Sequence, residues 1–253
     1  MASVELALND VSMSFGALKV LKKVRLTVHK GEFVVLVGPS GQGKSVVLKL
    51  LAGLLKPTYG SVLIEDSDLN QIPTSAQHQL LLKMGMLFQK NALFDSLTVG
   101  DNIAFPLREK TELGEPEIQR RVVYFLEQVG IGHARQLFPD EISGGMQKRL
   151  GIARALALEP KIVLYDDPTA GLDPITSRRI IELILRLRKE QGSTVVAVTN
   201  DMARAYQMAD RIAMVVDGEI IDTGDKDQTL GHKDPRVQQF VRGLLAGPLT
   251  EHA

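Results

Sequence analysis

One eight-residue segment constrains the fold of this chain more than any other. Gly38, Pro39, Ser40, Gly41, Gln42, Gly43, Lys44 and Ser45 match the pattern G-x-x-x-x-G-K-[ST] in full. A strand-like apolar run, Phe33–Val37, comes before it, and a helical pattern, Ser45–Leu55, follows. Glycines let backbone N–H groups turn inward, and the helix directs its positive end at an anion. The segment therefore predicts a phosphate-binding loop, in which Lys44 reaches the β- and γ-phosphates of a nucleotide and Ser45 ligates Mg²⁺.

Short apolar runs alternate with helical patterns along the rest of the chain. The predicted buried strands are Phe33–Val37, Lys83–Phe88, Lys161–Tyr165, Thr194–Thr199 and Arg211–Val216. The predicted helices between them are Ser45–Leu55, Met146–Leu158, Ile175–Glu190 and Met202–Ala209. Such alternation predicts an α/β P-loop NTPase fold with a mainly parallel core sheet. Two-residue alternation in Val4–Met13 and Leu18–Val28 predicts a small antiparallel sheet set against the core.

Residues 90–158 lack a convincing buried strand and are typical of an inserted helical subdomain. Its predicted helices are Val99–Leu107, Glu115–Val129 and Met146–Leu158. We expect an ATPase domain over residues 1–224, with its core in 1–89 and 159–224 and the helical subdomain in 90–158. Residues 225–253 form a C-terminal extension with an amphipathic segment, Asp234–Leu245, and a tail, Gly247–Ala253. This segment packs across a dimer, docks a partner or covers its own domain, and the sequence leaves the three roles open.

Composition excludes several classes of function. The 253 residues include no cysteine, which excludes a disulfide scaffold and cysteine–zinc sites. Thirty basic residues balance thirty acidic ones, which argues against nucleic acid held by bulk electrostatics. The sequence has neither a signal-peptide pattern nor an apolar run near the ~18 residues that a membrane span requires. We therefore expect a chain that does not cross a membrane by itself and binds no nucleic acid.

Two further motifs follow the phosphate loop. The apolar run Ile162–Asp166 ends in a carboxylate, and ligands bind at the carboxyl ends of strands in open α/β sheets. Asp166 is therefore a candidate Mg²⁺ ligand, acting through water. Before it comes Ile142-Ser143-Gly144-Gly145-Met146, where Ser143 is expected to cap a helix and the glycines leave their N–H groups open to an anion.

In this order the motifs resemble the nucleotide-binding subunit of an ABC transporter. The family signature usually has leucine and glutamine where this chain has Ile142 and Met146. The resemblance implies a homodimer in which the signature residues meet the γ-phosphate of ATP bound to the second subunit. It also implies that Phe15 stacks on adenine, although an ordinary core residue is the alternative. The remaining implied roles are Mg²⁺ contact for Gln89 and a loop crossing the dimer interface for Gly171, Leu172 and Asp173.

Two positions depart from the family pattern, and both concern the chemistry. Asp167 replaces the glutamate that polarises the attacking water, and its carboxylate is about 1.5 Å further back because one methylene is missing. Asn200 stands where a histidine is expected; it donates a hydrogen bond but cannot become cationic. With Lys44, these are the predicted catalytic residues. A displacement of about 1 Å costs on the order of a hundredfold in rate, so the sequence predicts ATP-driven dimerisation with slowed hydrolysis.

Three segments are similar in sequence to the ATPases of MCE-associated lipid transporters, such as the Mla-type phospholipid transporters. They are Asn91–Pro106, Asp234–Gly243 and the Ser-Gly-Gly-Met signature. The resemblance implies a peripheral subunit at the cytoplasmic face of a bacterial inner membrane. Its implied partners are two copies of an integral membrane permease and an MCE-domain protein, which move lipid between two membranes.

Three alternatives stay open: an importer for another solute, a nucleotide-gated regulatory subunit, and a soluble ABC protein of translation or DNA repair. The last commonly has two cassettes or a coiled-coil insertion, and this chain has neither. Lys148 and Arg149, just after the signature, are expected to face solvent, and the alternative is that they add positive potential near phosphate.

Overall fold

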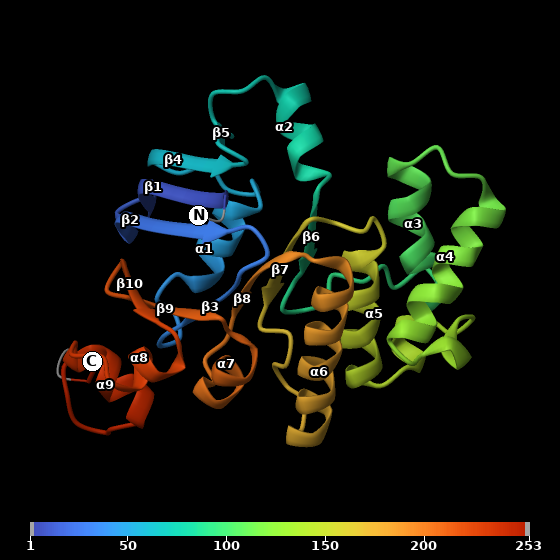
Figure 1. The fold of residues 1–253 in the computed structure, drawn as a ribbon. Helices are drawn as coiled ribbons and strands as arrows, with labels where there is room; N and C mark the ends of the chain where they lie inside the picture. Colours follow the sequence, from blue (N-terminus) through green and yellow to red (C-terminus); the bar gives the residue numbers. More distant parts are fainter. Residues whose placement is uncertain (1–2, 251–253) are drawn as a thin grey trace. The chain divides into compact units, whose positions relative to one another are not determined.

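Two units make up the computed structural model, which describes residues 3–250. The first contains the described residues up to Gln77 together with those from Thr194 onward, and the second is His78–Ser193. Helix α2 (Thr74–Leu81) lies at the sequence boundary between them. Each unit has its own strands and helices, labelled in Figure 1.

An antiparallel sheet in the first unit contains both of the strands predicted at the start of the chain. Its strand order is β2-β1-β4-β5, with β1 at Val4–Phe15, β2 at Leu18–His29, β4 at Tyr59–Ile64 and β5 at Ser67–Asp68 (Figure 1). Side chains alternate between buried and exposed along β2, because one face covers the core. The predicted antiparallel sheet is confirmed, and β4 and β5 were not predicted.

Four core strands of the first unit lie in the order β10-β9-β3-β8. They are β3 (Phe33–Val37), β8 (Thr194–Val198), β9 (Arg211–Val216) and β10 (Glu219–Gly224). β3 pairs in parallel with both β8 and β9, whereas β10 is antiparallel to β9. Every residue of β3 is buried, so its branched side chains pack on both faces. The mainly parallel pairing is confirmed, and it places the carboxyl ends of β3, β8 and β9 at one edge.

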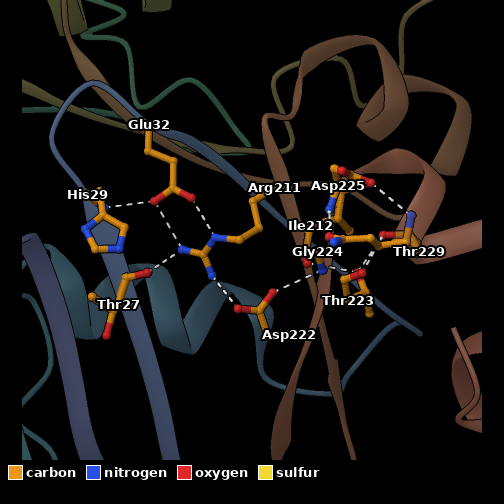
Figure 2. A network of polar contacts seen from close by, with 11 residues as sticks. Thr27, His29, Glu32, Arg211, Ile212, Asp222, Thr223, Gly224, Asp225 and Thr229 are labelled. Carbon is orange, nitrogen blue, oxygen red and sulfur yellow. Dashed lines mark hydrogen bonds and ion pairs between the residues drawn. The ribbon is translucent and has the colours of Figure 1, made fainter. Parts of the chain in front are cut away.

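A network of polar contacts connects several strands of this unit, and the guanidinium of Arg211 lies at its centre (Figure 2). Arg211 donates to both carboxylate oxygens of Glu32, at 2.6 and 3.1 Å, to Asp222 at 2.7 Å, and to the carbonyl of Thr27. It therefore ties β9 to β10, to the turn before β3, and to β2 of the antiparallel sheet. The backbone N–H of Lys22 also donates to the carbonyl of Gly218, at 2.7 Å.

The helices of the first unit differ from their predicted bounds at the ends. α1 covers Lys44–Leu51 and α7 covers Met202–Met208. The prediction that α1 reaches Leu55 is wrong, because the chain turns at Gly53, whose φ is 66°. α8 (Lys226–Leu230) was not predicted. α9 (Pro235–Arg242) lies within the predicted amphipathic segment.

Chain after α9 folds back onto that helix. The buried side chain of Gln239 donates to the carbonyl of Leu244, at 3.2 Å, and accepts from the N–H of Leu249, at 2.7 Å. Positions 251–253 of the predicted tail lie outside the described residues. In the part of the chain that the structure describes, no helix is long and apolar enough to cross a membrane.

The second unit combines two parallel strands with four α-helices. β6 (Met84–Leu87) pairs with β7 (Ile162–Asp166) in a register that joins Met84 to Ile162 and Leu87 to Tyr165. The helices are α3 (Val99–Lys110), α4 (Glu115–Gln128), α5 (Gly144–Leu156) and α6 (Pro174–Gln191). Residues 90–158 contain helices and no strand, as the sequence predicted.

Candidate nucleotide site

The phosphate loop runs between the buried strand β3 and the first residue of α1. Gly38 has φ 135°, and a Cβ there would lie 2.3 Å from the carbonyl oxygen of Val215 in β9, so only glycine fits. Gly41 has φ 80°, a left-handed conformation that glycine adopts without strain. Gly43 is the N-cap residue of α1. The backbone therefore has the curled shape that an anion site at a helix N-terminus requires.

Lys44 lies inside this loop. Its ammonium donates to the carbonyls of Gly38, at 2.8 Å, and Pro39, at 2.6 Å, and the residue is only 6% exposed. A buried ammonium held at the mouth of a backbone cradle adds a full positive charge where phosphate oxygens would bind. Ser45 follows it in the first turn of α1.

Two distant segments of the first unit support the loop. Asn200 follows β8, and its side-chain amide donates to the hydroxyl of Ser40 at 3.3 Å. The backbone N–H of Asp217, in the turn after β9, donates to the side-chain oxygen of Gln42 at 2.8 Å. Asn200 is thus at the phosphate loop, as its predicted role requires, whereas the contact of Asp217 was not predicted.

Phe15 ends β1 and is 47% exposed. A core aromatic would be buried, so the exposure disfavours the reading of Phe15 as an ordinary core residue. An exposed ring on a hairpin end is available to stack on a planar base.

The second unit contains the predicted acidic pair. Asp166 is the last residue of β7 and is 6% exposed. Asp167 follows with φ 48°, a left-handed conformation that Asp tolerates better than most residues. The strand therefore presents two successive carboxylates at its carboxyl end.

Gln89 comes just after β6, the neighbour of β7, and its side chain is exposed. The carbonyl of Gln89 accepts a hydrogen bond of 2.5 Å from the ammonium of Lys148 in α5. The prediction that Lys148 faces solvent is wrong: the residue is only 4% exposed. Helical spacing could have revealed this, because Lys148 lies one turn before the buried Ile152. Arg149 is half-buried and donates to the carbonyl of Val129, at 3.0 Å.

The signature segment begins α5. Ser143 is its N-cap residue, and the Ser143 hydroxyl accepts from the N–H of Met146 at 3.3 Å, which confirms the predicted cap. Gly144 is exposed, and a Cβ there would have no heavy atom within 4 Å. A Cβ on Gly145 would lie 3.0 Å from the Thr176 methyl group. The first turn of α5 is therefore open to an anion on one side and packed against α6 on the other.

The loop Gly171-Leu172-Asp173 lies in the same hollow as the signature. Asp173 is the N-cap residue of α6 and accepts from the N–H groups of Ile175, at 2.9 Å, and Thr176, at 3.0 Å. A hydrogen bond from the Thr176 side chain, together with these two N–H groups, holds the pKa of Asp173 below its usual value. A hollow of about 560 Å³ is lined by Ser143, Gly144, Gly145 and Met146 together with the three loop residues.

The motifs follow one another in a fixed order: phosphate loop, glutamine after a strand, capped signature helix, and strand ending in a carboxylate. The sequence profile of the ABC transporter family matches residues 21–170, more than half of the chain. The chain belongs to the ABC transporter family. It is an ATP-binding, ATP-hydrolysing cassette.

Curated relatives match nearly the whole cassette. This chain is 40% identical over 246 residues to the probable ribonucleotide transport ATP-binding protein mkl of Mycobacterium tuberculosis. The aligned region covers 97% of this chain and 68% of that protein. This chain is also 37% identical over 242 residues to the intermembrane phospholipid transport system ATP-binding protein MlaF of Escherichia coli. The aligned region covers 96% of this chain and 90% of MlaF. Identity to MlaF of Haemophilus influenzae is 39% over 226 residues, 89% of this chain and 86% of that one.

Solved structures agree with the fold. A dimeric bacterial ABC transporter cassette has a TM-score of 0.80 and 35% identity, covering 85% of this chain and 96% of that one. A protein of Clostridium perfringens that is part of the cbiONQ ABC transporter complex has a TM-score of 0.82 and 28% identity, covering 96% of both chains. The fold of the cassette is therefore the α/β fold of ABC ATPases.

Proposed function

We propose that this cassette energises a lipid transporter, most simply MCE-type phospholipid transport between the two membranes of a diderm bacterium. The observation that carries the proposal is the similarity to MlaF, an intermembrane phospholipid transport ATPase, along 96% of this chain and 90% of that one. The similarity includes both the ATP motifs and the C-terminal segment. It therefore supports a transporter assembly like that of MlaF, and not only the same ATP chemistry.

Each phosphate loop binds the phosphates of one ATP. The loop backbone, Lys44 and the N-terminus of α1 hold the negative charge, and the exposed ring of Phe15 stacks on adenine. Ser45, Gln89 and Asp166 supply a hydroxyl, an amide oxygen and a carboxylate, which are the hard donors that Mg²⁺ prefers. Mg²⁺ usually keeps several waters and is held by one or two carboxylates together with substrate phosphates, so phosphate and water would complete the site. When bound, Mg²⁺ would neutralise charge on the phosphates.

Hydrolysis is in-line attack of water on the γ-phosphate. Asp167 orients that water, and Lys44 stabilises the charge that develops on the phosphate oxygens. Asn200, which bonds to Ser40 of the loop, donates to the γ-phosphate. Because Asp167 has a short side chain and Asn200 carries no charge, turnover is slower than in a cassette with glutamate and histidine at these positions.

Two cassettes form a homodimer around two ATP molecules. The signature of one protomer, Ser143 to Met146, meets the γ-phosphate held by its partner, and the loop Gly171 to Asp173 crosses the interface. The hollow that these two segments share, with Ser143 and Gly144 open to solvent, supports this role. Residues 1–224 form the ATPase domain, with a core of 1–89 and 159–224 and a helical subdomain of 90–158; 225–253 form the extension.

The dimer acts at the cytoplasmic face of the inner membrane, as a peripheral subunit beneath two copies of an integral permease with an MCE-domain protein. A second candidate is transport of another solute. The name of the mycobacterial relative, which gives it as a probable ribonucleotide transport protein, favours this alternative.

The test begins with co-purification of the cassette from detergent-solubilised membranes. We expect a permease to be recovered, and mass spectrometry to find phospholipid with it. The complex in proteoliposomes should move fluorescent phospholipid with Mg·ATP and fail with Lys44→Ala. Ribonucleotide uptake without phospholipid movement would select the second candidate, and a cassette recovered without any membrane protein would contradict both.

A further inference from the structure

A buried lysine in the second unit joins three of the motifs. Lys148 lies in the first half of α5, the helix that Ser143 caps. Its ammonium donates to the backbone carbonyl of Gln89 at 2.5 Å, and only 4% of the residue is exposed. Gln89 comes just after β6, and β6 pairs with β7, which ends at Asp166. The single side chain thus connects the signature helix to the residue proposed to contact Mg²⁺.

The charge of Lys148 also acts on the acidic pair. Burial lowers the pKa of the Lys148 ammonium, and the negative charges of Asp167 and Asp166 oppose that shift. A buried ammonium needs partners to stay charged, and these carboxylates provide the compensating charge. A neutral side chain at this position would leave the carbonyl of Gln89 without the ammonium and the carboxylates without this cation.

We propose that Lys148 is a positioning residue for the magnesium site: it fixes the backbone of Gln89, so that the Gln89 side chain meets the ion, and it ties that backbone to the signature helix. The proposal rests on the proposed function, in which Gln89 contacts Mg²⁺. Mutation of residues that orient a metal ligand from behind typically lowers metal affinity by about 10- to 100-fold.

Magnesium-dependent binding of a fluorescent ATP analogue to the full chain tests this. The Kd is measured in EDTA and again with saturating Mg²⁺, and the ratio of the two reports the contribution of the ion. We expect Lys148→Met to reduce that ratio about tenfold, which is the lower end of the effect of residues behind metal ligands. The Kd in EDTA should stay unchanged, because Lys148 does not contact the phosphate loop in its proposed role. Lys148→Arg, which keeps a charged donor, should restore most of the ratio.

A double-mutant cycle separates positioning from general destabilisation. In the Gln89→Ala background the side chain that Lys148 positions is absent, so adding Lys148→Met should not reduce the ratio further. Arg186→Met is the matched control, because Arg186 of α6 also donates to a backbone carbonyl, that of Gln128, at 2.6 Å. Arg186→Met should lower thermal stability without changing the ratio.

The outcomes separate the two proposals. A wild-type protein that gains nothing from Mg²⁺ would overturn the proposed function itself. A wild-type protein that does gain, with Lys148→Met either unchanged or equally weakened in EDTA and Mg²⁺, would overturn only the positioning role. So would an additive loss in the Gln89→Ala background.

Discussion

The backbone of Asp167 has a consequence for its chemistry. Its φ of 48° lies in the left-handed region, where Asp and Asn are enriched among residues other than glycine. A longer glutamate at this position would bring the carboxylate closer to the attacking water, but its backbone would be strained by about 1 kcal/mol. The short side chain of Asp167 therefore suits its left-handed backbone. A glutamate at this position would raise the rate of hydrolysis and lower the stability of the fold.

We accordingly expect Asp167→Glu to raise steady-state ATP turnover by about tenfold, within the range that a displacement near 1 Å produces, and to lower the melting temperature. Turnover and thermal unfolding measured on the same preparation check both effects. Asp167→Asn is the control: it tolerates the same φ, so its stability should be kept while turnover falls. Unchanged turnover in Asp167→Glu would show that side-chain length does not limit hydrolysis.

Asn200 makes a separate prediction about pH. Its amide does not titrate, so this position contributes no pH dependence in the wild type. In Asn200→His the imidazole becomes cationic below a pKa of about 6.5, and the cation attracts the γ-phosphate. We expect turnover of the variant to rise as pH falls through that value, relative to wild type. A ratio of the two rates that stays constant from acid to neutral pH would place residue 200 away from the reacting phosphate.

At the scale of single residues, the sequence predicted the loop, the Ser143 cap and the helical pattern that contains Lys148. It did not predict the burial of Lys148, because charge was given more weight than helical spacing. It also gave no sign of the bond between Asp217 and Gln42, since the two residues are separated by most of the chain and the contact uses a backbone N–H. Contacts of this kind depend on tertiary structure, which local patterns do not encode.

At the scale of elements, segments with a continuous or alternating apolar pattern were predicted well, and mostly exposed segments were missed. β3, β7 and β8 are buried at every position, so their continuous apolar runs were clear signals. β10, an edge strand, has a single buried residue, and α2 has none. Their side chains carry no hydrophobic period, because one or both faces are in water. β10 and α2 could not be predicted because too few of their residues are buried to produce an apolar periodicity.

The contact between α3 and α4 predicts a stability that depends on pH. Arg108 of α3 bonds to Glu115 of α4, at 2.6 and 3.0 Å, and to Asp101, at 3.0 Å. Hydrogen bonds from Arg108 lower the pKa of Glu115 from 4.5 to about 2. A lowered carboxyl pKa stabilises the folded state above the unfolded value, and this contribution disappears as pH falls toward the folded value.

For Arg108→Met we therefore expect a lower urea midpoint than wild type at pH 7 and a smaller difference at about pH 3, between the two pKa values. Urea unfolding at both pH values measures it. A difference that is equally large in acid would mean that the carboxylate pairing does not cause it.

The network around Arg211 makes a prediction for the strands of the first unit. The side chains of Arg211 and Glu32 are 20% and 15% exposed, so the pair is largely shielded from water. Arg211→Met would leave the Glu32 carboxylate without its guanidinium (Figure 2) and should reduce the free energy of unfolding by about 2 kcal/mol. Arg25→Met removes an ion pair that is 76% and 53% exposed and should change little. Urea unfolding of both variants compares them, and equal losses would contradict the argument.

At the scale of the whole molecule, the proposed dimer forms each catalytic site from the loop around Lys44 of one protomer and the signature around Ser143 of the other. Lys44→Ala removes the ammonium at the phosphates, and Ser143→Arg blocks the open helix N-terminus, so each variant alone should be inactive. A mixed dimer combines both defects in one site and leaves the other site intact. Random pairing makes half of the dimers mixed, so an equimolar mixture should recover about a quarter of wild-type turnover if the two sites act independently. ATPase assays after mixing and dilution measure this.

A mixture as inactive as its components would mean either that each ATP is bound and hydrolysed by one protomer alone or that both sites must act together. A second mixture, of Lys44→Ala homodimer with wild type, separates these two explanations. Wild-type turnover per wild-type chain in that second mixture supports one protomer per ATP, and turnover that falls with the square of the wild-type fraction supports two sites that act together.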